Sequence, residues 1–242
     1  MSTKSKLPFL KLGHSPKIKD VNRIVVMGSE DVGKTALIVR FLTRKYLPEY
    51  THGNITCYER NILIDDKDVS IRIIDTSGKE TYSSLEKQDI FHHVDGFLVV
   101  YSVTDKTSFV TGGEMLKQLH QDFSTKGAYP VALIANKTDL THLRIINTIE
   151  GQRLALIYPR CSFYECSAAG DPKNVDVAFR EFIREVMQSK DSKKHLHVNS
   201  SLTVKSPNPR RNSAGNSTLS SWWKRPRSSS ACENRQDRTF TM

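Results

Sequence analysis

The segment that most constrains this chain is Gly28-Ser29-Glu30-Asp31-Val32-Gly33-Lys34-Thr35, which matches the phosphate-loop pattern G-x-x-x-x-G-K-T. Its two glycines permit backbone angles with which the loop can wrap its N–H groups around a phosphate, at the positive end of a following helix. Residues 22–27 predict a buried strand before the loop, and residues 34–45 predict an amphipathic helix after it, as the motif requires. From this motif alone, a chance match on a surface turn and a P-loop ATPase or kinase stay open as alternatives.

Lys34 is expected to reach the β- and γ-phosphates, and Thr35 to offer its hydroxyl to Mg²⁺. The expected nucleotide contacts along the loop are Gly28, Glu30, Asp31, Val32, Gly33, Lys34, Thr35 and Ala36. A second Mg²⁺ ligand is predicted at Asp75, which follows a strand-like run. Gly78 could present its N–H to a γ-phosphate, because no side chain blocks the approach. Asp75 alone fits an ordinary strand-to-loop junction, and only its combination with Lys34 and Thr35 favours the metal.

A guanine site is indicated by Asn136-Lys137-Thr138-Asp139, which follows the buried run 131–135. The Asp139 carboxylate can accept two N–H bonds from N1 and N2 of guanine, whereas adenine would leave that charge unpaired. Asn136 is expected to tie loops together, and the Lys137 stem to lie over the ribose. Ser167 and Ala168 follow a further strand, where backbone N–H groups could bind guanine O6. The motifs together predict GTP or GDP with Mg²⁺ as the ligand.

These motifs, in this order, resemble those of the Ras superfamily of small GTPases over about residues 20–190. Within it, segments 40–46 and 163–168 resemble the Ras-like estrogen-regulated growth-inhibitor branch and its neighbours. By this resemblance, Tyr46 matches the aromatic that packs on the guanine face, with a core aromatic at the helix end as the alternative. The resemblance implies a monomeric GTPase switch that binds effector proteins when GTP-loaded and is served by an exchange factor.

Two departures from the family predict slow hydrolysis. Lys79 follows Gly78, where most Ras relatives carry the Gln that orients the attacking water, and lysine is a donor only. Glu30 and Asp31 stand where Ras has small glycines, and the bulk of Glu30 should obstruct an activating protein's arginine, which contributes about 10³–10⁵ in rate. The residues expected to influence catalysis are Lys34, Gly78 and Lys79.

A third departure lies in the first switch segment. Alignment by Tyr50 and Tyr58 puts Gly53 where the family has its Mg²⁺-binding Thr, with Thr51 and Thr56 as the nearest hydroxyls. Loss of that ligand predicts a weaker hold of the loop in the loaded state. Two hypotheses follow: a slow GTPase that switches between two states, or a pseudo-GTPase scaffold that holds nucleotide for stability and signals through its tails.

Alternating strands and helices predict an α/β fold of the P-loop NTPase G-domain type, with a mostly parallel six-stranded sheet and helices on both faces. The expected strands are 22–27, 56–64, 69–75, 96–102, 131–136 and 162–166, and the expected helices are 34–45, 81–92, 106–123, 149–157 and 173–189. The G domain is predicted to span 21–190, between a basic flexible extension at 1–20 and a disordered, basic, Ser-rich tail at 191–242.

The net charge of +10 belongs to the ends of the chain. Residues 1–20 hold five Lys against one Asp, and residues 191–242 hold ten basic against three acidic residues, so the domain between them is nearly neutral. The high pI is therefore no evidence for nucleic-acid binding. The four cysteines have no metal-site spacing, which favours reduced thiols in a cytoplasmic protein.

The tail contains Trp222-Trp223 next to Lys224, Arg225 and Arg227. Indole rings favour the bilayer interface and basic residues favour anionic lipid, so this segment could contact the inner face of the plasma membrane. A nuclear-localisation cluster and a partner-binding segment are the alternatives. No lipid anchor is expected, because Thr239 stands where prenylation needs Cys and residue 2 is Ser rather than Gly.

Overall fold

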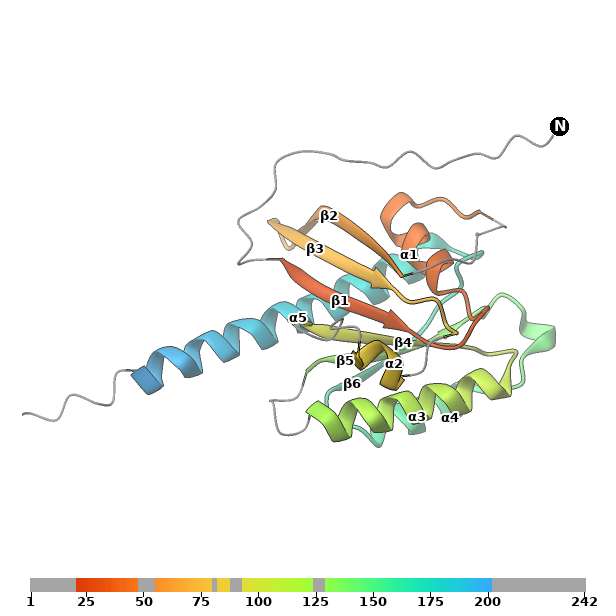
Figure 1. Cartoon of the computed structure of the whole chain (residues 1–242). Helices are drawn as coiled ribbons and strands as arrows, with labels where there is room; N and C mark the ends of the chain where they lie inside the picture. The colour runs from red at the N-terminus through yellow and green to blue at the C-terminus, as the bar shows by residue number, and fades with distance from the viewer. Residues whose placement is uncertain (1–20, 48–54, 80–81, 88–92, 124–128, 202–242) are drawn as a thin grey trace, which may run out of the picture. The chain divides into compact units, whose positions relative to one another are not determined.

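The computed structural model describes residues 21–47, 55–79, 82–87, 93–123 and 129–201, with side chains up to 193 apart from those of 86, 87 and 123. Its centre is a six-stranded sheet in the order β2-β3-β1-β4-β5-β6, in which β2 is antiparallel to β3 and every other neighbouring pair is parallel (Figure 1). The strands are β1 (Asn22–Met27), β2 (Thr56–Ile64), β3 (Lys67–Asp75), β4 (Gly96–Ser102), β5 (Val131–Asn136) and β6 (Cys161–Glu165).

The strand sequences explain their places in the sheet. All seven residues of β4 are buried, as expected for a parallel strand covered on both faces. β2 lies at an edge and most of its side chains are exposed. The turn that joins it to β3 contains Asp65 and Asp66 at positive φ angles of 49° and 60°, the backbone form that suits a tight hairpin.

Helices cover both faces of the sheet, and each face has its own apolar core. Buried residues of α1 (Lys34–Thr43) and α5 (Pro172–Ser201) share one core, where the rings of Phe41 and Phe179 stack 4.6 Å apart. Residues of α2 (Tyr82–Lys87), α3 (Lys106–Phe123) and α4 (Thr148–Leu156) belong to the other. A short 3₁₀ helix, η1 (Thr141–Leu143), precedes α4.

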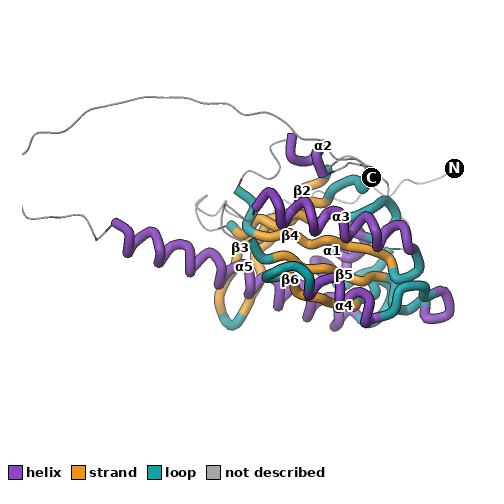
Figure 2. The backbone as a smooth tube through the Cα atoms, turned by 90° about the horizontal axis from the view of Figure 1, so that it is seen from below, coloured by secondary structure: helices purple, strands orange, loops and turns teal. Residues whose placement is uncertain are grey.

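The predicted fold class is confirmed. Apart from η1, which was not predicted, the differences concern the ends of elements. α1 ends at Thr43 rather than near 45, because Arg44 takes a left-handed conformation (φ 59°) and its N–H closes on the Arg40 carbonyl at 2.8 Å. α5 continues to Ser201, past the predicted domain boundary at 190 and into the segment expected to be disordered. Residues 191–201 contain no Pro or Gly, so nothing in their sequence stops the helix. α5 consequently extends beyond the sheet (Figures 1 and 2).

The thiols of Cys57, Cys161 and Cys166 are free. Burial raises the pKa of both Cys161 and Cys166 to about 12, so these two stay protonated at neutral pH. Among the described residues, no helix has the length and apolar character needed to cross a bilayer. The Trp-containing tail and the N-terminal extension lie outside the described residues.

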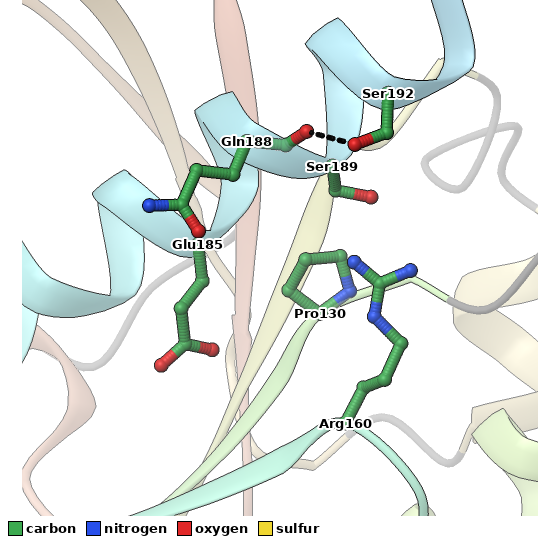
Figure 3. Close-up of a pocket in the computed structure, with 6 residues that line it drawn as sticks. All are labelled: Pro130, Arg160, Glu185, Gln188, Ser189 and Ser192. Atoms are coloured by element: carbon green, nitrogen blue, oxygen red, sulfur yellow. Dashed lines mark hydrogen bonds between the residues drawn. The ribbon is translucent and has the colours of Figure 1, made fainter. Parts of the chain in front are cut away.

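A cavity of about 290 Å³ lies beside the second half of α5 (Figure 3). Pro130 and Arg160, which line it, directly precede β5 and β6, so the cavity is at the amino ends of these strands. All four nucleotide motifs follow the carboxyl ends of strands. The cavity is therefore at the opposite edge of the sheet from the candidate site.

Candidate nucleotide-binding site

The sheet brings the four motifs to one edge. Strands β1, β3, β5 and β6 run parallel, and they end directly before Gly28, Thr76, Lys137 and Cys166. Residues far apart in the sequence therefore meet in neighbouring loops, as is usual for ligand sites at the carboxyl ends of parallel strands.

The phosphate loop needs glycine at both ends of its motif. Gly28 has a φ of 144°, and a Cβ there would overlap the Val100 carbonyl oxygen. Gly33 has a φ of 92°, and a Cβ there would overlap the Asn136 side-chain amide. The loop then leads directly into the first turn of α1. This shape leaves a helix amino end open to an anion.

The Lys34 side chain is buried inside the loop. Its Nζ donates to the carbonyl oxygens of Gly28 at 3.0 Å and Ser29 at 2.8 Å. These bonds hold the ammonium group against the loop backbone. A lysine so placed can act as a fixed positive charge for a phosphate that the loop encloses.

Thr35 and Asp75 form the part of the site that suits a metal. The Thr35 hydroxyl donates to Asp75 Oδ2 at 2.6 Å, across two segments of the chain. The other carboxylate oxygen, Oδ1, is buried and has no hydrogen-bond partner among the described residues. A hydroxyl and an unsatisfied carboxylate oxygen are ligands that Mg²⁺ prefers. The residues present therefore fit a magnesium ion.

Burial raises the pKa of Asp75, while the Thr35 hydrogen bond and the Lys34 charge lower it. The net direction is upward, so the ionised carboxylate is less favourable in the fold than in the unfolded chain. Ionisation of Asp75 therefore lowers the free energy of unfolding. This loss of stability is absent at a pH below the ordinary Asp pKa and is fully present once the pH exceeds the raised pKa. A bound divalent cation would offset this cost.

We predict that Asp75→Asn separates stability from metal binding. Asn can still accept the Thr35 hydrogen bond but carries no charge, so the ligand-free variant should melt at least as high as the wild type at pH 7. Its Mg²⁺ dependence of nucleotide affinity should fall by about tenfold or more. Calorimetry and nucleotide titrations with and without EDTA measure both effects, with Asp68→Asn on the exposed part of β3 as control. An unchanged Mg²⁺ dependence would contradict the prediction.

Asn136 ties three loops together, as the sequence predicted. Its Nδ2 donates to the Val32 carbonyl at 2.7 Å, and its Oδ1 accepts the Ala168 N–H at 3.2 Å. The side chain is almost fully buried. It therefore joins the phosphate loop to the two loops predicted to read the base.

Ser167 has a role that the sequence analysis missed. Its hydroxyl donates to Asp139 Oδ1 and accepts N–H bonds from Ala169 at 3.1 Å and Gly170 at 2.8 Å. From the sequence, only the backbone around Ser167 is expected to contact the base. Here its side chain orients the exposed Asp139 carboxylate, although the two residues are 28 positions apart. No local pattern indicates such a contact.

The remaining predicted residues lie around these loops. Tyr46 is 41% exposed, so it is not the core aromatic that was considered as an alternative. Lys137 has a positive φ of 65° in the turn after β5. Thr56 begins β2, opposite Asp75 in the strand register, whereas Thr51 and Gly53 lie outside the described residues.

Glu30 and Lys79 form an ion pair that was also missed. The Lys79 ammonium lies 3.4 Å from Glu30 Oε1, with side-chain exposures of 71% and 39%. In the sequence the two residues are separate departures from the family pattern. The fold makes them partners, one from the phosphate loop and one from the segment that follows β3.

The fold carries a phosphate loop, a hydroxyl and a carboxylate that fit Mg²⁺, and a side-chain pair predicted to bind a base. These features define a P-loop nucleotide-binding protein. Comparison with known proteins gives the family: the model for the Ras family matches residues 23–188. The chain is 36% identical over 166 residues to the human Ras-related and estrogen-regulated growth inhibitor, covering 68% of this chain and 80% of that protein. It is 34% identical over 217 residues to zebrafish Ras-like protein family member 11B, covering 86% and 85%. The chain belongs to the Ras family and is a Ras-like small GTPase.

Proposed function

We propose that this GTPase is a signalling switch with slow intrinsic hydrolysis that is insensitive to activating proteins which insert an arginine. The observation that carries the proposal is the Glu30–Lys79 ion pair. Lysine cannot accept a proton from an attacking water, and here its ammonium group faces a carboxylate. The bulk of the Glu30 side chain would also obstruct an incoming arginine.

The roles proposed for the site residues follow their positions. Lys34 and the loop N–H groups bind the phosphates, and Asp139, with Ser167 and Ala168, binds guanine. Thr35 and Asp75 would hold Mg²⁺, which when bound neutralises phosphate charge that develops during hydrolysis. Gly78 lies close to the phosphate loop and would offer its N–H to a γ-phosphate, and the exposed Tyr46 would cover the base.

We predict that Lys79→Gln increases single-turnover GTP hydrolysis by about tenfold, because glutamine can both donate to and accept from a water, a barrier change of about 1.4 kcal/mol. To measure the rate, Mg²⁺ is mixed rapidly with the GTP-loaded protein to start the reaction, and the released phosphate is quantified over time. The matched control is Lys106→Gln, on the exposed start of α3. No gain in rate would contradict the water-positioning argument.

The nucleotide that purifies with the full-length protein from cells tests the switch proposal. Mostly GTP is expected if hydrolysis is slow. Mostly GDP would contradict slow hydrolysis and direct attention to an exchange factor. An empty site would contradict the switch proposal and direct attention to signalling through the tails. The second proposal, a pseudo-GTPase scaffold that holds nucleotide for stability, is favoured by Gly53 at the position of the family's switch threonine.

The partners and location that we propose rest on the sequence alone. Effector proteins would bind the GTP-loaded form. The Trp222-Trp223 segment, with its neighbouring basic residues, would add contact with anionic membrane at the inner face of the plasma membrane. Sedimentation of the full-length protein with vesicles that contain or lack phosphatidylserine tests the membrane contact, and equal binding to both would contradict it.

A further inference from the structure

Two loops from distant parts of the chain are in contact at the candidate site. Glu30 belongs to the phosphate loop, and Lys79 belongs to the segment that follows β3. Besides their ion pair, Gly78 lies so close that an added Cβ would be 2.8 Å from the Glu30 backbone nitrogen. The same Cβ would overlap the Lys34 ammonium group. The segment 76–79 is therefore closed onto the phosphate loop.

We infer that the Glu30–Lys79 ion pair is a clasp that holds segment 76–79 closed without help from a γ-phosphate. This inference rests on the proposed nucleotide site and concerns its regulation. In a GTP-dependent switch, a loop closes because the γ-phosphate and its Mg²⁺ hold it, and it relaxes after hydrolysis. Here the contact that holds the segment is made by two side chains of the protein itself, those of Glu30 and Lys79. The position of this segment should then differ little between the GDP and GTP forms.

The pair also settles an electrostatic conflict at the site. A carboxylate beside the phosphates would repel them, and the Lys79 ammonium compensates that charge. Removing Glu30 and removing Lys79 should therefore have different results. Without Glu30, Lys79 becomes available to a γ-phosphate, so closure should become dependent on GTP. Without Lys79, Glu30 is left uncompensated, and both forms should open.

The size of the effect is limited by solvent. Ion pairs between exposed groups are weak, so the clasp should shift the balance between open and closed segment by no more than about fivefold. Salt should reduce it further, because the Debye length falls to about 3 Å at 1 M ionic strength. A measurement must therefore resolve changes of this size in a local opening equilibrium.

Amide hydrogen exchange of residues 76–79 in the full-length protein tests the clasp. Wild type, Glu30→Gln, Lys79→Gln and the charge swap Glu30→Lys with Lys79→Glu are compared with GDP, with a non-hydrolysable GTP analogue, and without nucleotide. We expect similar exchange of wild type in both nucleotide forms. Glu30→Gln should exchange severalfold faster than wild type with GDP and without nucleotide, but not with the GTP analogue. Without nucleotide, exchange at residues 76–79 in the charge-swap variant should return towards that of the wild type, because no phosphate then acts on the reversed charges.

The matched control is Glu59→Gln, which removes an exposed ion pair with Arg72 between β2 and β3. It should leave exchange at 76–79 unchanged. The clasp is overturned if Glu30→Gln exchanges like wild type with GDP, or if the correctly folded swap exchanges as fast as the single variants. If the protein binds no nucleotide, the proposed function fails, but the nucleotide-free comparison of wild type with Glu30→Gln still tests the clasp.

Discussion

Replacing Asp139 by alanine is expected to remove the preference for guanine over adenine. The Asp139 carboxylate is held by the Ser167 hydroxyl, which leaves its remaining acceptor positions for the base. Hydrogen bonds to a charged group contribute about 1.5–3 kcal/mol each, so losing two of them should weaken GTP binding at least about 10²-fold. Competition of GTP and ATP against a fluorescent GDP measures both the affinity and the ratio.

Two further variants make this prediction specific. Asp68→Ala removes an exposed carboxylate of β3 and should change neither quantity. Ser167→Ala keeps the carboxylate but loses its orientation, so it should weaken GTP binding less than Asp139→Ala does. A GTP-to-ATP ratio that survives in Asp139→Ala would show that the base is read by other groups.

Replacing Lys34 by methionine is expected to weaken nucleotide binding strongly. Methionine preserves much of the buried stem but removes the charge and both donated bonds to the Gly28 and Ser29 carbonyls. Charge-assisted bonds to phosphate add to this loss, so affinity should fall about 10²–10³-fold. The thermal shift that nucleotide produces should be much smaller than in the wild-type protein at the same nucleotide concentration.

The control for this second prediction is Lys106→Met, which removes an exposed lysine at the start of α3. Its nucleotide-induced thermal shift should equal that of the wild type. Because Lys34 is buried, circular dichroism of the ligand-free Lys34→Met protein must first show a native fold. A folded variant that keeps its thermal shift would refute the phosphate role of Lys34.

The sheet could be predicted from sequence because its strands carry strong local signals. β4 and β5 are apolar runs bounded by loop residues, and β1 leads directly into the phosphate loop. The motifs then fix which strand ends meet. The ends of helices were less predictable, since the polar segment after Lys190 continues α5 where its composition suggested disorder.

The site was predictable in its residues but not in its side-chain pairings. Spacing identified Thr35, Asp75, Asn136 and Asp139, because each belongs to a short motif of known geometry. The Glu30–Lys79 and Ser167–Asp139 contacts join residues from separate motifs. Such contacts depend on how loops from different strands approach each other in space, and a linear sequence carries no local signal for that distance.

The buried side-chain amide of Asn136 couples the loops proposed to bind the base to the loop proposed to bind the phosphates. Because it bonds Val32 on one side and Ala168 on the other, displacement of either loop must strain the other. Guanosine and pyrophosphate, added as separate fragments, should therefore bind cooperatively. We therefore expect a whole nucleotide to leave through a concerted loosening of the three loops, with a similar barrier for the release of GDP and GTP.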